Sequence, residues 1–138
     1  MSTIVPNPEQ FQQFTTSPDT GPVVMLNLLK FKAHADGEEE SGADAYRRYG
    51  DAVVKMVEAR GGCIVWSGRA DQVLIGNPAA DWDVVALVQY PSRKAFLEMV
   101  TSQEYQEVHV YRERGLERTI LVACTPMVDH LIPIEETR

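Results

Sequence analysis

The chain has no hydrophobic run long enough to cross a bilayer, and it has only two cysteines. Its longest apolar stretch, residues 23–29, is interrupted by Asn27 and is far too short for a membrane span. The N-terminus lacks the basic and apolar regions of a signal peptide, so we expect a cytoplasmic protein. Cys63 and Cys124 have no second cysteine nearby, which indicates packed thiols rather than a redox or nucleophilic pair.

Basic charge is scarce as well. The 138 residues carry 13 Lys and Arg against 20 Asp and Glu, for a formal net charge of -7. Such acidity repels phosphate groups, so neither nucleic acid nor a membrane is expected as a partner. The common phosphate-loop, dinucleotide, nucleophile-elbow and zinc-protease motifs are absent. His34, His109 and His130 lack metal-ligand spacing, so we predict no metal and no cofactor.

Hydrophobic periodicity divides the chain into a short leading helix and six further elements. Pro8 suits the first turn of the leading helix, predicted over 8–15. Serines that can cap and glycines that can stop a helix frame the later ones. The six elements are a strand over 23–32, a helix over 43–60, strands over 63–75 and 82–90, a helix from Ser92 to Arg114 interrupted at 101–102, and a strand over 118–125.

The order β-α-β-β-α-β is that of the split βαβ or ferredoxin-like plan, an α+β fold with a four-stranded antiparallel sheet. The chain length suits one domain, and we expect a single domain over 1–138. Its core would cover about 22–126, after the extra N-terminal helix and before an apolar tail over 127–138.

The first strand is apolar on both faces. Side chains alternate along a strand. One face therefore carries Val23, Met25, Asn27, Leu29 and Phe31, and the other carries Val24, Leu26, Leu28, Lys30 and Lys32. Two helices can cover only one face of such a sheet. The economical cover for the other face is a second copy, which predicts a homodimer packed sheet against sheet as a dimeric α+β barrel.

Five short motifs fall in order along the chain. They are Tyr46-x-x-Tyr49, Gly61-Gly62, Gly68, Tyr90-Pro91-Ser92-x-x-Ala95-Phe96 and Ser102-x-Glu104-Tyr105-Gln106. Over about residues 23–126 the chain resembles a bacterial family of unknown function in the dimeric α+β barrel superfamily. That superfamily includes cofactor-free monooxygenases, haem-degrading enzymes, chlorite dismutases, muconolactone isomerases and stress-response barrels of no known activity.

Two polar residues interrupt apolar patterns and are the candidate catalytic residues. Asn27 lies in the most apolar strand, where a buried amide needs hydrogen bonds. It would either bond to neighbouring backbone or donate to a ligand oxygen between the sheet and the helices. His109 shares a helical stripe with Tyr105 and Val108. It would act there as acid or base, unless it is a half-exposed packing residue.

Further residues are candidates for substrate binding. Aromatic side chains can wall a pocket, although aromatic stripes more often belong to a core. Arg69 could reach a ligand anion or remain an exposed charge at a strand edge. Arg112 could pair with a ligand carboxylate or with a surface glutamate. The substrate-binding set is Tyr46, Trp66, Arg69, Tyr105 and Arg112.

The sequence leaves three hypotheses about function. The first is a cofactor-free oxygenase or isomerase of a small organic molecule, as the superfamily resemblance implies. The second is a non-catalytic dimeric domain, structural or ligand-sensing. The third is a haem-binding or haem-degrading protein, because Asn27 and His109 resemble in position the asparagine and histidine that serve the haem in such relatives. Met99 departs from that pattern, since those relatives carry a tryptophan there.

Overall fold

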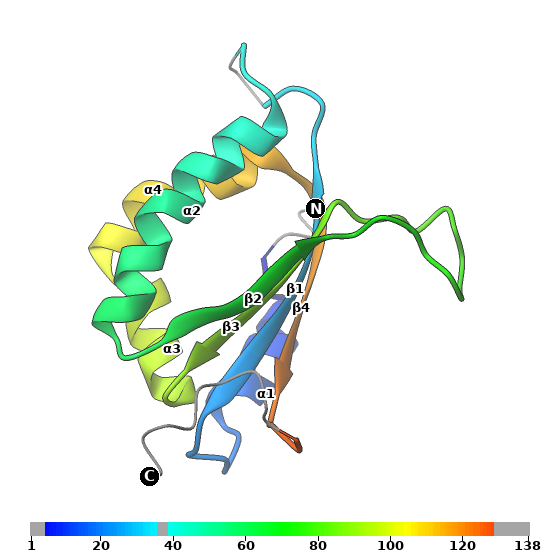
Figure 1. Cartoon of the computed structure of the whole chain (residues 1–138). Coiled ribbons are helices and arrows are strands. Elements are labelled where there is room, and N and C mark those ends of the chain that lie inside the picture. Colours follow the sequence, from blue (N-terminus) through cyan, green and yellow to red (C-terminus); the bar gives the residue numbers. More distant parts are fainter. Residues whose placement is uncertain (1–4, 36–38, 129–138) are drawn as a thin grey trace, which may run out of the picture.

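The computed structural model describes residues 5–35 and 39–128. Their helices and strands follow the order predicted for the ferredoxin-like plan, after one leading helix (Figure 1). The elements are α1 (Pro8–Thr15), β1 (Val23–Phe31), α2 (Gly42–Ala59), β2 (Cys63–Arg69), β3 (Val84–Tyr90), α3 (Arg93–Val100), α4 (Gln103–Gly115) and β4 (Leu116–Cys124). The predicted ferredoxin-like α+β fold is confirmed. None of the described helices combines the length and the apolar character that crossing a membrane requires.

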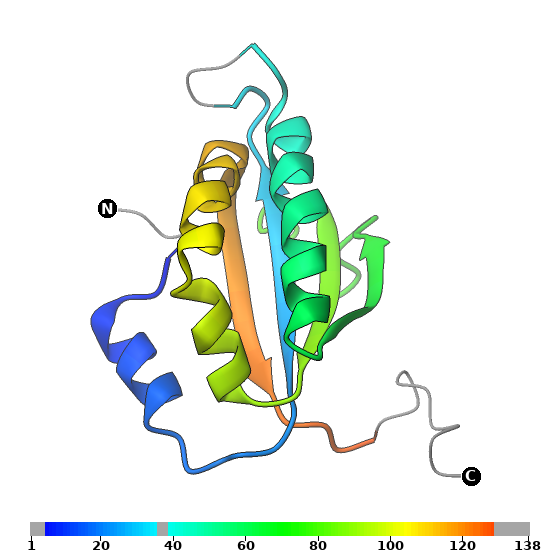
Figure 2. The ribbon, with the colours of Figure 1, turned by 90° about the vertical axis from the view of Figure 1, so that its left-hand side faces the viewer.

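The four strands form one antiparallel sheet in the order β2-β3-β1-β4. The central strand β1 therefore pairs with β3 on one side and with β4 on the other. Helices α2, α3 and α4 lie over one face of the sheet, and α1 packs beside α3 (Figure 2). We call the face under the helices the covered face and the opposite one the uncovered face. Cys63 and Cys124 lie on opposite edge strands of the sheet.

Serine side chains cap the N-termini of α2, α3 and α4. Ser41, Ser92 and Ser102 each accept a hydrogen bond from the backbone N–H three residues later, which satisfies a donor that the first helical turn leaves unpaired. After α2 the chain turns at Gly61, whose φ of 85 lies in the left-handed region that glycine adopts without strain.

Two glycines bring α2 and α4 together at one end. Lys32 N donates to Gly115 O at 2.8 Å, and Gly42 N donates to Lys32 O at 3.0 Å. A Cβ on Gly42 or Gly115 would collide with backbone atoms of the neighbouring segment. This close approach sets the separation of the two helices where α2 carries Tyr46.

The core lies between the covered face and the helices. Val23, Met25 and Leu29 of β1 are 1%, 4% and 2% exposed. Because these residues alternate along β1, their common burial identifies the helix-facing side of the strand. They and their buried partners from the helices and β3 form the main cluster: Val23, Met25, Tyr49, Val53, Val57, Tyr90, Met99 and Tyr105.

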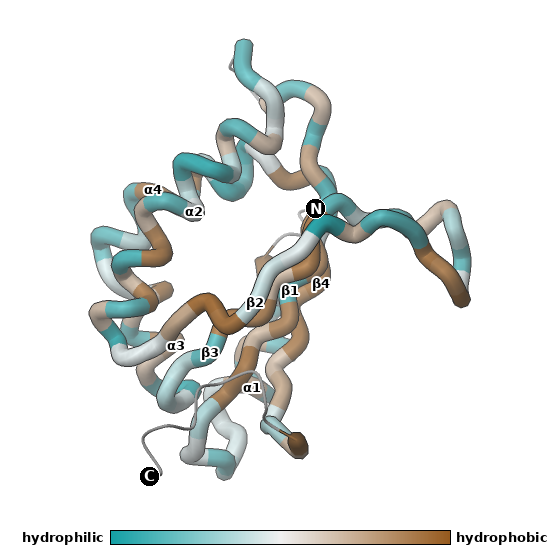
Figure 3. Tube along the Cα trace, viewed as in Figure 1, coloured by the Kyte–Doolittle hydropathy of each residue, from teal (hydrophilic) through white to brown (hydrophobic). Residues whose placement is uncertain are grey.

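The uncovered face carries apolar side chains that no described element covers. Trp66, Ile120 and Val122 are 48%, 45% and 41% exposed. The strand register places them in rows with Leu26 and Leu28 of β1. Figure 3 shows hydrophobic residues running along the strands of the sheet.

The second strand is shorter than predicted. The sequence indicated a strand to residue 75, but β2 ends at Arg69 and residues 70–83 leave the sheet (Figure 1). We call residues 70–83 the arm. The apolar residues at positions 73–75 suggested a longer strand, yet a strand needs a hydrogen-bonding neighbour and no described strand reaches them. Strand β2 has one irregularity in its pairing with β3, a register shift between Ile64 and Trp66.

The other predicted boundaries agree with the structure or differ from it by one or two residues. Strand β3 begins at Val84, two residues later than predicted, and β4 begins at Leu116, two residues earlier. Just before β3, the Asp83 carboxylate accepts a hydrogen bond from Phe31 N at 2.9 Å. Most of the predicted tail over 127–138 lies outside the described residues.

Candidate functional site

Most of the predicted site residues lie between α2, α4 and the covered face. Tyr46 comes from α2, and Tyr105, His109 and Arg112 come from α4. The three α4 residues are spaced by four and by three, which places them on one side of the helix. Asn27 lies on the helix-facing side of β1. We call this region the helix–sheet site.

Tyr49 and Tyr105 join α2 to α4. Their hydroxyl oxygens are 2.8 Å apart, and the residues are 8% and 7% exposed. Burial raises the pKa of both phenols above the ordinary value of 10, so both are protonated near neutral pH. One hydroxyl must donate to the other. The accepting hydroxyl keeps its own proton for a further partner.

Tyr46 and Tyr90 add two phenols to the same region. The Tyr46 ring centroid lies 5.1 Å from that of Tyr49. Burial raises the pKa of Tyr46 to about 12 and raises the pKa of Tyr90 as well, with Tyr105 adding to both shifts. The hydroxyls of Tyr46 and Tyr90 have no hydrogen-bond partner among the described residues. Neither hydroxyl oxygen is fully buried. Both can therefore hydrogen-bond to solvent or to a ligand.

Arg112 places a positive charge beside these phenols. It is only 8% exposed, so it does not extend along the surface toward solvent. Its charge lowers the pKa of Tyr46, Tyr49 and Tyr105, against the larger effect of burial. A buried cation beside hydroxyl donors favours negative charge on a bound molecule.

His109 borders the tyrosines and is partly buried. Its ring centroid lies 5.6 Å from that of Tyr105, and Nδ1 lies 3.6 Å from Glu113 Oε1. Burial lowers the pKa of His109 below its ordinary value of 6.5, Glu113 raises it and Arg112 lowers it. The imidazole is therefore neutral at pH 7 and able to accept a proton, and Glu113 lies where it would stabilise the resulting imidazolium.

Asn27 bonds to the backbone of the sheet. Its Nδ2 donates to Met25 O at 3.1 Å and to Ala86 O at 3.5 Å. This is the backbone alternative that the sequence left open. The two carbonyls occupy the donors of the amide, and Oδ1 receives no hydrogen bond from the described residues. The geometry suits an acceptor rather than the predicted donor to a ligand.

The covered face is partly open at the level of Asn27. Asn27 pairs with Ala86 on β3 and with Leu121 on β4, so the three side chains share one row under the helices. Leu121 is 40% exposed, whereas Met25 in the neighbouring row is 4% exposed. Solvent therefore reaches the row that contains Asn27, although helices lie above it.

Two predicted substrate-binding residues lie elsewhere. Trp66 shares a row with Leu87 and Leu26, which places it on the uncovered face. The side chain of Arg69 is 84% exposed and pairs with Asp71, with Nε 2.9 Å from Oδ1. Arg69 is thus the exposed strand-edge charge that the sequence left as its alternative. The alternation of a strand does not reveal which face the helices cover, so the sequence could not place Trp66.

Sequence reasoning did not assign Tyr90 and Glu113 to this site. The sequence nevertheless contains a feature that could have placed each of them. Tyr90 belongs to the alternating set of β3 that pairs with the helix-facing residues of β1, since it lies opposite Val23. Glu113 follows His109 by one helical turn and so shares its side of α4.

Metal and haem find little support in this arrangement. Across residues 5–35 and 39–128 no three or more His, Cys, Asp or Glu side chains gather in a way that could hold a metal ion. A haem ligated by His109 would need a porphyrin-wide space beside the imidazole. The Tyr105 ring lies beside the imidazole, with centroids 5.6 Å apart, and it contacts the Tyr49 ring in turn.

The fold and the site define a small ferredoxin-like α+β protein with a tyrosine-rich region between sheet and helices. The chain belongs to the family described as domain of unknown function, DUF1330, whose profile matches residues 40–125. This confirms the resemblance to a family of unknown function. A comparison with curated proteins finds no match.

Solved structures share the fold of this chain. A protein of unknown function from Rhodopseudomonas palustris is 35% identical, with a TM-score of 0.88, and the match covers 94% of this chain and 100% of that one. An Arabidopsis thaliana protein is 17% identical with a TM-score of 0.56, covering 78% and 97%. A putative antibiotic biosynthesis monooxygenase from Caulobacter crescentus is 12% identical with a TM-score of 0.51, covering 79% and 92%. The last two show a likeness of fold alone.

Proposed function

We propose that this protein is a cofactor-free enzyme that removes a proton from a small, weakly acidic organic molecule in the helix–sheet site. The observation that carries the proposal is the partly buried His109, which contacts Tyr105 and Glu113 and follows the same side of α4 as the buried Arg112. Isomerisation by proton transfer and cofactor-free oxygenation both begin with such a deprotonation. A phenol or an enolisable ketone is the matching substrate class.

His109 is the proton acceptor in this proposal. Loss of the substrate proton converts His109 to the imidazolium, which Glu113, 3.6 Å away, stabilises. Negative charge then develops on the substrate oxygen. The phenols of Tyr46 and Tyr105 supply donors for that oxygen, and Arg112 supplies the positive field. An isomerase would return the proton to another carbon. In an oxygenase the carbanion would reduce dioxygen and form a C–O bond to it, and the resulting peroxide anion would take the proton back from His109 to give a hydroperoxide.

Asn27 and Leu121 form the floor of the proposed site. Leu121, 40% exposed, offers apolar contact, and Asn27 Oδ1 offers an acceptor. A substrate that is apolar on one side and carries an acidic hydroxyl on the other matches both surfaces.

We further propose that the protein is a homodimer that packs its uncovered faces together. Trp66, Ile120 and Val122 are 48%, 45% and 41% exposed, and apolar side chains in one contiguous sheet face favour association. A two-fold axis would let one self-complementary surface serve both copies. The helix–sheet site lies on the other side of the sheet, so each copy would keep its own site.

A phenolic probe tests the proton transfer. We would titrate 4-nitrophenol into the protein at pH 6.5 and follow the absorbance that separates phenolate from phenol. The expected result is phenolate stabilised on binding, because His109 takes the proton and Arg112 favours the anion. His109→Gln should retain the fold and lose the phenolate signal.

His34→Gln is the matched control, since His34 is an exposed histidine outside the site. It should behave as the unsubstituted protein does. An unchanged phenolate signal in the His109 variant would remove His109 from the role of proton acceptor.

A non-catalytic, ligand-sensing or structural domain is the second candidate. The backbone bonds of Asn27 and the Tyr49–Tyr105 contact favour it, because both form without a ligand. A structural domain predicts that neither 4-nitrophenol nor related phenols bind at millimolar concentration, and a ligand-sensing domain predicts binding without the phenolate signal. Chemical-shift mapping at His109 and Tyr105 would separate the two candidates.

A further inference from the structure

The arm projects from the sheet on the side away from the helices. Figures 1 and 2 both place residues 70–83 beyond the uncovered face, on the far side of the sheet from α2 and α4. The tip of the arm is apolar, as Figure 3 shows. Leu74 and Ile75 are 82% and 91% exposed. These side chains contact almost nothing in their own chain.

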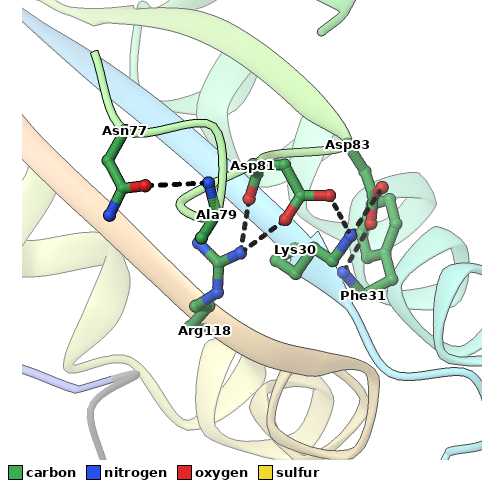
Figure 4. A network of polar contacts seen from close by, with 7 residues as sticks. All are labelled: Lys30, Phe31, Asn77, Ala79, Asp81, Asp83 and Arg118. Atoms are coloured by element: carbon green, nitrogen blue, oxygen red, sulfur yellow. Dashed lines mark hydrogen bonds and ion pairs between the residues drawn. The ribbon is translucent and has the colours of Figure 1, made fainter. Parts of the chain in front are cut away.

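Polar contacts hold the base of the arm against the uncovered face (Figure 4). Lys30 Nζ lies 3.0 Å from Asp81 Oδ2 and 3.6 Å from Asp83 Oδ1. Arg118 Nη2 lies 2.9 Å from Asp81 Oδ1. The Arg118 guanidinium also lies 4.5 Å from the ring centroid of Trp82. The arm therefore leaves the sheet in a defined direction.

A local turn shapes the returning half of the arm. Asn77 Oδ1 accepts a hydrogen bond from Ala79 N at 3.0 Å, and Asn77 O accepts one from Ala80 N at 3.0 Å. Side-chain-to-backbone bonds of this kind stabilise turns. Gly76, with φ of 127, occupies a conformation that other residues rarely adopt. The exposed tip is thus part of a formed structure.

The same contacts neutralise positive charge on the uncovered face, where a second copy would pack. Lys30 and Arg118 pair with each other across β1 and β4, and they place two positive charges on that face. In a two-fold pairing each copy would present these cations to its partner. Asp81 and Asp83 of the arm neutralise them within the chain, so two identical faces can approach without that repulsion.

We infer that the arm is a clasp between two copies, with Leu74 and Ile75 buried on the surface of the second copy. The inference rests on the proposed homodimer. Any copy that covers the uncovered face must lie beside the arm, because both are on the same side of the sheet. Two-fold symmetry makes the clasp reciprocal, so that each copy holds the other.

The test compares dissociation constants by analytical ultracentrifugation over a range of protein concentrations. The variant is the double substitution Leu74→Ser and Ile75→Ser. The matched control is Gln72→Ser, an exposed polar change on the same arm. The double variant should weaken the dimer by about tenfold or more, because two apolar anchors are lost from the interface. The control should leave the dissociation constant unchanged.

A second measurement tests the contact directly. Mixed dimers of methyl-labelled and unlabelled copies should give nuclear Overhauser effects from the Leu74 and Ile75 methyl groups to the partner. A dimer that keeps its affinity in the double variant, or that shows no such effects, overturns the clasp and leaves the dimer standing. A protein that is monomeric at every concentration overturns the proposed homodimer and the clasp together. In neither case is proton transfer at His109 affected.

Discussion

The two faces of the sheet are built from the same strands and differ sharply in burial. On β1, Met25 is 4% exposed beneath the helices, while its neighbour Leu26 points to the uncovered face and is only partly buried. Both are large apolar residues in one continuous run. The difference arises from α2, α3 and α4, which cover one face and leave the other.

The comparison separates two kinds of stabilisation. Burial on the covered face occurs within one chain, so it contributes to folding at any protein concentration. Burial of the uncovered face would require a second copy, so its contribution would follow mass action. Substitutions on the two faces should therefore differ in how their effects depend on concentration.

The largest effect is expected on the covered face. Met25→Ala should lower the free energy of unfolding by about 3 kcal/mol, because it removes buried methylene and sulfur contacts and leaves a cavity. Urea unfolding followed by circular dichroism measures this loss. The loss should be the same at low and high protein concentration. A loss that varies with concentration would mean that Met25 belongs to the interface.

The next largest effect is expected on the uncovered face. Leu26→Lys should raise the dissociation constant of the dimer about 100-fold, because each copy then brings a charge into an apolar contact. Sedimentation equilibrium measures the shift, and the monomer should remain folded. Gln103→Lys adds the same charge at an exposed position of α4 and serves as the control. Equal affinities for the two variants would contradict the sheet-to-sheet pairing.

The smallest effect concerns pH. The pKa of His109 is lowered in the folded chain, so below pH 6.5 the unfolded chain binds a proton that the folded chain resists. The contribution of His109 to stability is complete above pH 6.5 and is lost as the pH falls through the lowered pKa. Unfolding free energies at pH 7.5, 6 and 5 should therefore decline less in His109→Gln than in the unsubstituted protein.

This pH comparison also has a direct readout. An NMR titration of the imidazole should give a midpoint below 6.5. A midpoint above 6.5 would mean that Glu113 outweighs burial, and His109 would then be partly protonated in the neutral range and a poorer base.

The fold could be read from local patterns because each pattern has a local cause. Ser41, Ser92 and Ser102 begin helices by bonding to backbone N–H groups three residues away. The strands of the sheet were recognised from their apolar runs. The arm was missed because residues 73–75 have the composition of a strand, and only the position of the neighbouring strands decides whether such a segment pairs.

The site could be read only in part. The spacing of Tyr105, His109 and Arg112 placed them on one side of a helix, and the structure brings them beside Tyr46. Trp66 was misplaced because alternation defines two faces without saying which one faces the helices. The bonds of Asn27 to Met25 O and Ala86 O depend on a neighbouring strand distant in sequence, so no local rule anticipates them.

Element order, helix ends and the amphipathic stripe of α4 were thus encoded locally, in periodicity and capping, which act over a few residues. The burial of Arg112 near Tyr46, Tyr49 and Tyr105, the lowered pKa of His109 and the direction of the arm were decided by tertiary packing. These properties depend on which distant segments exclude water and place charge beside a given group, and that arrangement exists only once the sheet and helices have come together.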